Sequence, residues 1–147
     1  MNKFNSIFLC APYTFTIDSK TNLINETYKA WLQKIIDYLQ QKVDILYNSH
    51  TREEWGVKLS SPKEAVSIDF AEIRIADCII AYIGNPRSIG VSVELGFAAA
   101  HKKPIFILNE KDDEVPYFVQ GLEAYTNVKL INFEDLNDLF IKLDKEF

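Results

Sequence analysis

The sequence has few of the residues that mark secreted, membrane or fibrous proteins. Its 147 residues include two cysteines, five glycines and five prolines, whereas 48% are hydrophobic. The apolar runs are only a few residues long, and no signal-peptide core follows the first residues. Both cysteines lie inside apolar runs, which favours buried, reduced thiols over a disulfide framework. We therefore expect a folded cytoplasmic protein and exclude a membrane-spanning or collagen-like chain.

Positive charge is also scarce. The 16 Lys and Arg residues are outnumbered by 21 Asp and Glu residues, and the formal net charge is −5 at pH 7. The basic residues form no cluster of the kind that a nucleic-acid polymer or an anionic membrane surface requires. Both are excluded as partners, whereas a small anion held by one loop stays possible.

The apolar pattern predicts the fold class. The length fits one domain, residues 1–147, and short apolar runs alternate with longer segments of helical period, as expected for parallel strands covered by helices. This predicts a single flavodoxin-like or Rossmann-like α/β domain, a three-layer sandwich with a five-stranded parallel sheet in the order 2-1-3-4-5. We expect strands at 6–11, 43–47, 78–83, 104–108 and 128–131, and helices at 28–41, 61–76, 88–102, 116–124 and 134–147.

Ligands of open parallel sheets bind beyond the carboxyl ends of the strands, so the segments that follow the strands are the candidate site. The segment 84–91, Gly-Asn-Pro-Arg-Ser-Ile-Gly-Val, joins the third strand to a helix. The amides of a helix N-terminus and the Ser88 hydroxyl can bind one phosphate. The segment is neither a P-loop nor a dinucleotide-binding fingerprint, and a plain serine cap explains Ser88 equally well.

Two carboxylates fall within the apolar stripes of two expected helices. Glu94 lies three residues after Val91, and Asp69 lies three residues after Val66, so we expect both acids to point inward. An ionised acid withdrawn from water is costly unless it is paired, bound or protonated. Two explanations remain: a structural salt bridge or cap for each acid, or a functional dyad whose members push their pKa values apart.

A few further residues are weaker candidates. Arg52 and Trp55 follow the second strand, where a guanidinium and an indole can contact a heterocycle, although Trp55 suits a satellite core position equally well. Phe8, in the middle of the first strand, is expected in the core. His50 and His101 stand apart without the spacing of a metal site, so no metal is implied.

Several motifs together resemble the nucleoside 2-deoxyribosyltransferase superfamily over nearly the whole chain. They are Asp-Phe-Ala-Glu-Ile at 69–73, Pro-Arg-Ser-Ile-Gly-Val-Ser-Val-Glu-Leu-Gly at 86–96 and Lys-Pro-Ile at 103–105. Within it, Arg-Glu and Trp-Gly in segment 52–56 are most similar to the cytidine 5′-monophosphate N-glycosidases of nucleoside-antibiotic pathways. The resemblance implies hydrolysis of a pyrimidine ribonucleotide to free base and ribose 5-phosphate, without a cofactor, in a homodimer.

The resemblance also implies roles for individual residues. Glu94 matches the catalytic glutamate that attacks C1′ or activates the attacking water, and Asp69 matches the aspartate that helps the base to leave. Ser88, with Gly90 and Val91 beside it, matches the site of the 5′-phosphate. A deoxyribosyltransferase, a deoxynucleotide hydrolase and a nucleotide-binding protein without turnover stay open as alternatives.

The resemblance and the segments that follow the strands together indicate contacts to the sugar and the base. Phe8 matches a phenylalanine of the ribonucleotide-using branch, where hydrolases of deoxynucleotides tend to carry tyrosine. The chain departs from its relatives at Thr14, where one of them has an arginine near the base, and at Tyr117, where the deoxynucleotide hydrolases have a serine that reaches the phosphate across the dimer. We expect Tyr117 to reach the neighbouring site. The expected sugar and base contacts are Phe8, Pro12, Tyr13, Arg52, Trp55 and Gly84.

Overall fold

The computed structural model describes residues 3–13 and 16–147. Its sheet is entirely parallel and has the strand order β2-β1-β3-β4-β5. The predicted α/β class, parallel sheet and strand order are therefore confirmed. The strands are β1 (Ser6–Cys10), β2 (Ile45–Tyr47), β3 (Cys78–Tyr82), β4 (Ile105–Glu110) and β5 (Val128–Phe133).

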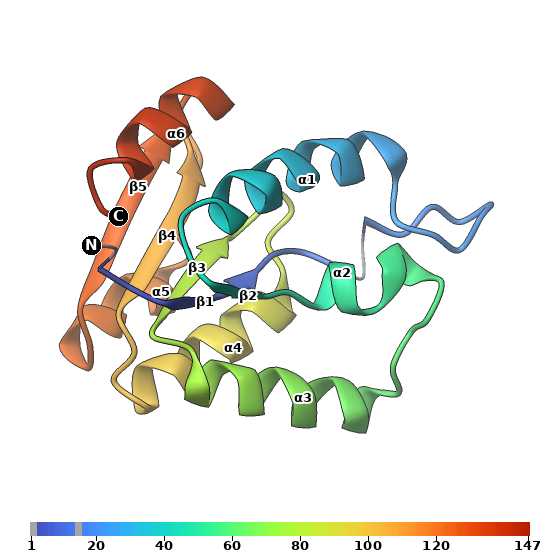
Figure 1. Ribbon diagram of the computed structural model, residues 1–147, viewed down its shortest axis with the longest axis horizontal. Coiled ribbons are helices and arrows are strands. Elements are labelled where there is room, and N and C mark those ends of the chain that lie inside the picture. The colour runs from blue at the N-terminus through green and yellow to red at the C-terminus, as the bar shows by residue number, and fades with distance from the viewer. Residues whose placement is uncertain (1–2, 14–15) are drawn as a thin grey trace.

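Helices cover both faces of this sheet. The helices α1 and α6 lie on one face, and α3, α4 and α5 lie on the other, which gives the three layers visible in Figure 1. Among the described residues, no helix is both long enough and apolar enough to cross a bilayer. The helices are α1 (Glu26–Gln40), α2 (Ser49–Arg52), α3 (Pro62–Ile75), α4 (Ile89–Ala100), α5 (Tyr117–Gln120) and α6 (Leu136–Leu143), with 3-10 turns at Glu54–Gly56 and Gly121–Ala124.

The alternation of side chains along β1 divides the core in two. Ile7 and Leu9 pack on the side of α1 and α6, whereas Phe8 and Cys10 pack on the side of α3 and α4. All four side chains are buried, because helices cover both faces of the strand. Residues at even positions of β1 therefore lie beneath the face that carries the acids of α3 and α4.

The two long helices of that face begin where their capping residues predict. Ser61 and Glu64 form a reciprocal capping box at the start of α3, with Pro62 in the first turn. Ser88 caps α4, because its hydroxyl accepts a hydrogen bond of 3.3 Å from the amide of Val91.

The segment 48–56, which reads as a polar loop, folds instead into α2 and a 3-10 turn. Asn48 explains the difference, since its side chain accepts from the amide of Thr51 at 3.1 Å and donates to the carbonyl of Leu9 at 3.3 Å. Trp55 and Gly56 then turn the chain with positive φ angles of 57° and 103°. One asparagine thus starts a short helix and ties it to β1.

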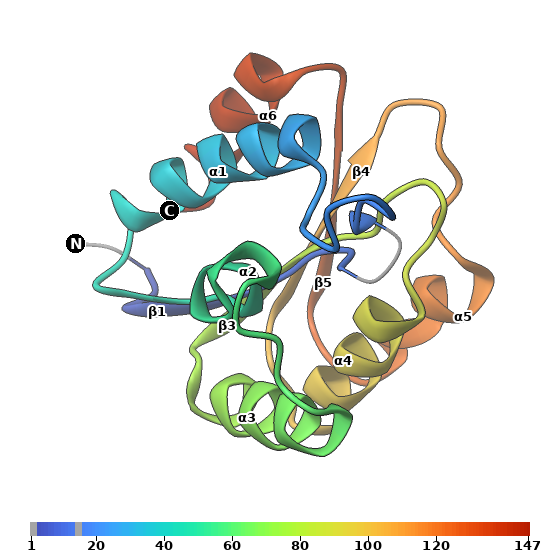
Figure 2. The same ribbon diagram turned by 90° about the vertical axis from the view of Figure 1, so that its right-hand side faces the viewer.

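The strand order creates a crevice at the edge where the strands end. The chain leaves β1 towards α1 on one face and leaves β3 towards α4 on the opposite face. Figure 2 shows α2 and residues 16–25, which lead into α1, in front of this edge. Such a reversal of winding is where α/β proteins bind their ligands.

Candidate active site

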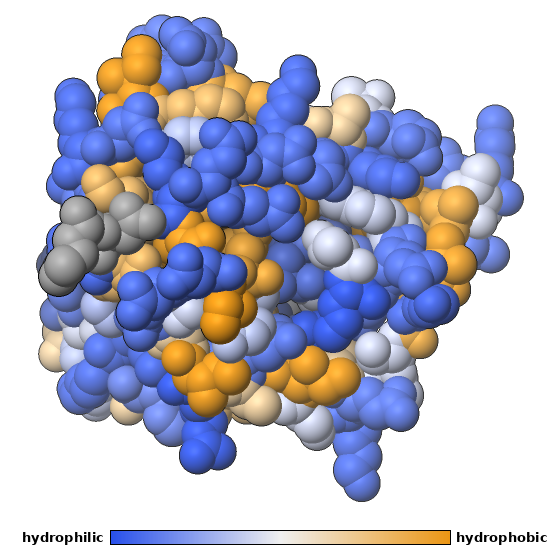
Figure 3. Space-filling model, in the orientation of Figure 1, coloured by the Kyte–Doolittle hydropathy of each residue, from blue (hydrophilic) through white to orange (hydrophobic). Residues whose placement is uncertain are grey.

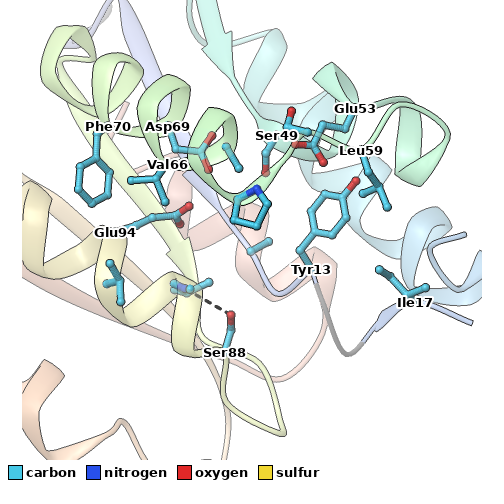
Figure 4. Close-up of a pocket in the computed structure, with 17 residues that line it drawn as sticks. Tyr13, Ile17, Ser49, Glu53, Leu59, Val66, Asp69, Phe70, Ser88 and Glu94 are labelled. Carbon is cyan, nitrogen blue, oxygen red and sulfur yellow. Dashed lines mark hydrogen bonds between the residues drawn. The ribbon is translucent and has the colours of Figure 1, made fainter. Parts of the chain in front are cut away.

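A cavity of ≈ 420 Å³ opens at this edge, between α3, α4 and the segments that follow β1 and β2. Figure 4 shows that side chains from these separate parts of the chain point into one space. Its volume lies within the range of small-molecule sites. The polar or charged groups of its wall include Tyr13, Ser49, Glu53, Asp69, Ser88 and Glu94.

Asp69 on α3 and Glu94 on α4 lie close together at one end of the cavity (Figure 4). Burial, and then the charge of Asp69 and a hydrogen bond between the two carboxyls, raise the pKa of Glu94 well above its ordinary value of 4.5. The substrate-free pair therefore keeps a proton on Glu94 at a pH where an exposed glutamate has lost it. Such a pair contains both a proton donor and a carboxylate.

Arg52 holds one member of this pair. Its Nη2 bonds to Asp69, and its Nη1 bonds to Glu72, one turn further along α3, at 2.6 Å. We expected Arg52 to contact the sugar or the base, but its guanidinium is bound to α3 and the residue is not part of the cavity wall. The two ion pairs fix the orientation of Asp69 instead.

Cys10 on β1 lies next to Glu94, the other acid of the pair. The expectation of a buried, reduced thiol agrees with its 2% exposure and its free state. The structure adds a contact that the sequence analysis missed, since the thiol lies close to Glu94 and lowers the pKa of that carboxyl. Burial and the Glu94 carboxyl both raise the pKa of Cys10, so the thiol stays protonated and can donate to Glu94. The period of two along β1 is the signal that places Cys10 beneath α4.

Phe8 and Trp55 lie outside the cavity wall. Phe8 is 1% exposed and belongs to the core beneath α3 and α4, as its position in the middle of a strand predicted. Trp55 is half-buried and packs against the core on the α1 side, the satellite position that the sequence left open. The contact of Phe8 with a sugar stays a prediction from the resemblance.

Pro12 and Gly84 shape the segment behind Tyr13 and are not part of the wall either. The Pro12 carbonyl accepts from the Tyr28 hydroxyl and from Nε2 of His50, both at 2.9 Å. Gly84 has a φ of 81°, and a Cβ at this position would lie 2.5 Å from Cγ of Pro12, so no larger residue fits. These contacts fix the point from which Tyr13 enters the cavity.

His50 supports this arrangement from below. It is fully buried, and its ring lies 4.6 Å from the Tyr13 ring, measured between centroids. Burial lowers the pKa of His50 to about 4, against the opposing effect of the bond to Pro12. The imidazole is therefore neutral near pH 7 and donates from Nε2 to the Pro12 carbonyl. Thr14, the neighbour of Tyr13, lies outside the described residues.

The N-terminus of α4 forms another part of the wall, where Ser88, Gly90 and Val91 line the cavity. Ser88 is both a cap and a wall residue, as the dashed bond to the Val91 amide in Figure 4 shows. Because helix geometry leaves the first amides without intrahelical acceptors, this end can bind an anion.

Val66 lies in a different position from the one that we expected, whereas the expected role of Tyr117 concerns a neighbouring subunit. Val66, expected in the core-facing stripe of its helix, is 50% exposed and lines the cavity, because α3 extends past the edge of the sheet that would cover it. Tyr117 is 88% exposed on α5 and does not line the cavity of its own chain. A contact of Tyr117 with a neighbouring subunit stays a prediction.

Glu53 and Ser49 are wall residues to which the sequence analysis gave no role, although Glu53 belongs to the Arg-Glu motif of the resemblance. Glu53 is only 6% exposed, although the sequence around it is polar throughout. Its position after the second strand was the available signal, since that edge of the sheet carries ligands. The burial was not predictable without the fold of α2.

The comparisons with known proteins agree with this site. The model of the nucleoside 2-deoxyribosyltransferase family matches residues 7–133. No curated protein matches the sequence. Among solved structures, the chain is similar to the CMP N-glycosidase BcmB of Clostridium botulinum, with 25% identity and a TM-score of 0.71 over 95% of this chain and 98% of the other.

Two further structures are similar. BlsM shares 29% identity and a TM-score of 0.83, over 99% of this chain and 91% of its own. The 2-deoxyribosyltransferase of Bacillus psychrosaccharolyticus shares the fold, at 19% identity and a TM-score of 0.65 over 92% of this chain and 90% of its own. The chain therefore belongs to the nucleoside 2-deoxyribosyltransferase family, whose members are enzymes that act on N-glycosidic bonds.

Proposed function

We propose that this enzyme hydrolyses a pyrimidine ribonucleoside 5′-monophosphate of the cytidine type to the free base and ribose 5-phosphate. The observation that carries the proposal is the pair of Asp69 and Glu94 in one cavity with the N-terminus of α4. The similarity to a CMP N-glycosidase over almost the full length of both chains supports it. We place the reaction in the cytoplasm, where Cys10 and Cys78 stay reduced.

The proposed mechanism follows from the charges that develop when the N-glycosidic bond breaks. Cleavage develops positive charge at C1′ of the sugar and negative charge on the departing base. In our proposal the proton of the acid pair passes through Asp69 to the base, and Glu94 is left as a carboxylate that faces C1′. Water then adds its hydroxyl to C1′ and returns its proton to the pair. Base and ribose 5-phosphate leave, and the pair regains its initial state.

Arg52 and Cys10 keep the two acids in place during this cycle. The two ion pairs of Arg52 fix the rotamer of Asp69, and the thiol of Cys10 donates to Glu94. When Glu94 loses its proton, the thiol stabilises the new carboxylate. Pre-arranged groups of this kind lower the barrier because they need no reorganisation at the moment of reaction.

In the same proposal, the start of α4 binds the 5′-phosphate. Ser88 offers a hydroxyl, and the first amides of the helix offer donors at its positive end. Binding energy from the phosphate, which does not react, orients the sugar over Glu94. A nucleotide is thus preferred to the matching nucleoside.

Phe8 concerns the choice of sugar. We propose from the resemblance that its ring lies beneath the sugar and leaves room for a ribose 2′-hydroxyl, which a tyrosine would occupy. Phe8→Tyr is expected to shift the kcat/KM ratio of cytidine to deoxycytidine monophosphate by about tenfold towards the deoxynucleotide. An unchanged ratio in a folded, active variant would leave Phe8 with a core role only.

We also propose that the enzyme works as a homodimer. Apolar side chains are exposed at the start of α4 and on α5, among them Ile89 (83%), Tyr117 (88%) and Phe118 (86%). Exposed apolar groups of this size mark an interaction surface. Sedimentation at micromolar concentration tests the proposal, and an active monomer would remove the role of Tyr117 across the interface.

A panel of ribonucleoside and deoxyribonucleoside monophosphates tests the reaction, with free base measured by chromatography. Release of cytosine with ribose 5-phosphate is the expected result. Addition of a second free base separates the alternatives, because a transferase forms a new nucleotide and a hydrolase does not. Binding of nucleotides without any turnover would instead favour the binding protein.

Ser88→Ala tests the phosphate site. We expect kcat/KM to fall about tenfold or more for cytidine monophosphate and to change little for cytidine, because only the nucleotide has the phosphate. Ser61→Ala is the matched control, since it removes the cap of α3 without touching the cavity wall. Equal losses for nucleotide and nucleoside would reduce Ser88 to a cap.

A further inference from the structure

The far end of the cavity holds a buried carboxylate that the proposed reaction does not use. Figure 4 shows Glu53 beside Tyr13 and Ser49, across the cavity from Ser88. Glu53 is 6% exposed. A carboxylate at this depth costs free energy unless a charged or hydrogen-bonding partner offsets the loss of water.

The neighbouring cations are bound elsewhere. Arg52 forms its ion pairs with Asp69 and Glu72, and Lys58 pairs with Glu54 at 2.6 Å. Within 3–13 and 16–147, no salt bridge involves Glu53. The carboxylate therefore keeps its acceptor capacity for a group that enters the cavity.

The Tyr13 hydroxyl is the second group with unused capacity at this end. Its oxygen is buried, and in the described part of the chain it has no hydrogen-bond partner of regular geometry. Burial and the Glu53 carboxyl both raise the pKa of Tyr13, so the phenol is neutral and can donate or accept. A buried hydroxyl without a regular partner is rare in folded proteins. Here it lies beside a buried carboxylate that forms no salt bridge within the described residues, so the two groups together point to a polar ligand edge.

We propose that Glu53 is the residue that selects the base, by accepting a hydrogen bond from an exocyclic amino group. This proposal rests on the proposed function and gives it a specificity determinant. Cytosine presents an amino donor at C4 next to an acceptor at ring N3, which matches Glu53 and a donating Tyr13. Uracil presents a carbonyl oxygen at C4, which meets the carboxylate as acceptor against acceptor.

The expected size of the effect follows from this mismatch. One well-placed pair between a side chain and a base edge discriminates by about ten- to a hundredfold. We expect the parent enzyme to prefer cytidine to uridine monophosphate in kcat/KM by such a factor. Glu53→Gln, whose amide both donates and accepts, reduces the preference by tenfold or more, chiefly because uridine monophosphate becomes a better substrate.

Glu54→Gln is the matched control. Glu54 precedes Trp55, pairs with Lys58 and is not part of the cavity wall, so its change leaves the base preference at the parent value. Tyr13→Phe is the second variant, needed if Glu53→Gln fails to fold. It keeps the ring that packs on His50, loses only the hydroxyl, and lowers the preference by a smaller factor.

The outcomes separate this proposal from the proposed function. Absence of turnover with every nucleotide rejects the hydrolase itself, and the role of Glu53 falls with it. Turnover with a base preference that neither Glu53→Gln nor Tyr13→Phe moves by more than twofold rejects Glu53 alone and leaves the hydrolase in place. A collapsed preference in Glu53→Gln, with Glu54→Gln unchanged, supports the assignment.

Discussion

The two faces of the sheet are built for different purposes. On one face, α1 buries Leu32, Ile35, Ile36 and Leu39 against the strands. On the other face, α3 has nearly the same length but buries only Ile73. Val66, Ile68 and Ile75 of α3 are instead exposed, and Figure 3 shows apolar side chains over this helix along the lower edge of the molecule.

This difference shows where the functional site is located. Both faces of the sheet bury apolar side chains, which contributes about 25 cal/mol for each Å² removed from water. The α3 and α4 face carries two close carboxyls, one of which has a raised pKa, and an open cavity. Functional sites commonly combine such unfavourable features, and the rest of the fold compensates for them.

The largest expected effect is on catalysis, from the face with the cavity. Glu94→Gln keeps the shape of the side chain but cannot become a carboxylate, so we expect kcat to fall by about 10³-fold or more while nucleotide binding persists. Single-turnover release of base measures the rate of the reaction, and calorimetry measures the affinity for the nucleotide. Glu134→Gln, on an exposed residue paired with Lys111, is the control. Activity within tenfold of the parent would remove Glu94 from the reaction.

Asp69→Asn is expected to lower kcat by about 10²- to 10³-fold, because the amide cannot pass a proton to the base. Glu72→Gln tests the specificity of this effect, since it removes the other partner of Arg52 and leaves Asp69 in place. We expect a loss of less than about tenfold for this control, from weaker positioning of Asp69 by Arg52. Equal losses in the two variants would assign Asp69 a structural role only.

Two apolar substitutions, one on α1 and one on α3, test the contrast between the faces directly. Leu32→Ala on α1 is expected to lower the free energy of unfolding by about 2–5 kcal/mol, whereas Val66→Ala on α3 costs less than about 1 kcal/mol. Activity of the folded fraction should follow the opposite order, because Val66 lines the cavity. Urea unfolding measures the stability of both variants, and KM measurements on the same samples show the effect on the cavity. Similar losses in the two variants would mean that both helices contribute equally to the free energy of unfolding.

The smallest expected effect is a pH-dependent gain of stability in Glu94→Gln. In the parent, the folded-state pKa of Glu94 is raised above the ordinary 4.5, so the unfolded chain releases its proton first as the pH rises. The parent thus loses stability from about pH 4.5 upwards, until the pH passes the raised pKa, and the glutamine variant does not. Thermal melts should show a Tm advantage of a few degrees at pH 8 that vanishes at pH 4. A constant difference would contradict the raised pKa.

The sequence predicted the architecture well because the fold rests on repeated local signals. Buried runs such as Cys78–Tyr82 identify strands, and Ser61 and Ser88 mark the starts of their helices. The strand order follows from short right-handed connections. All of these features depend on residues close together in the chain.

The site was predictable only in part, because its contacts join distant segments. Helical spacing predicted that Asp69 and Glu94 point inward, and both line the cavity, although Val66, the reference residue for Asp69, is itself exposed. The pairing of Arg52 with Asp69 was not predictable, since it depends on how the four-residue helix α2 lies against α3. For the same reason the burial of Glu53 in the cavity wall was not predictable, since the residues that bury it are far away in sequence.

Arg52 and Glu53 are adjacent in the chain, yet one bonds to Asp69 and the other lies in the wall near Tyr13. A single peptide bond therefore joins Arg52, which orients Asp69, to Glu53 at the opposite end of the cavity. An insertion or deletion within 48–56 would disturb both at once, whereas a substitution at position 53 alone would not. In directed evolution this segment is best exchanged between relatives as an intact cassette, with base preference then tuned at one position inside it.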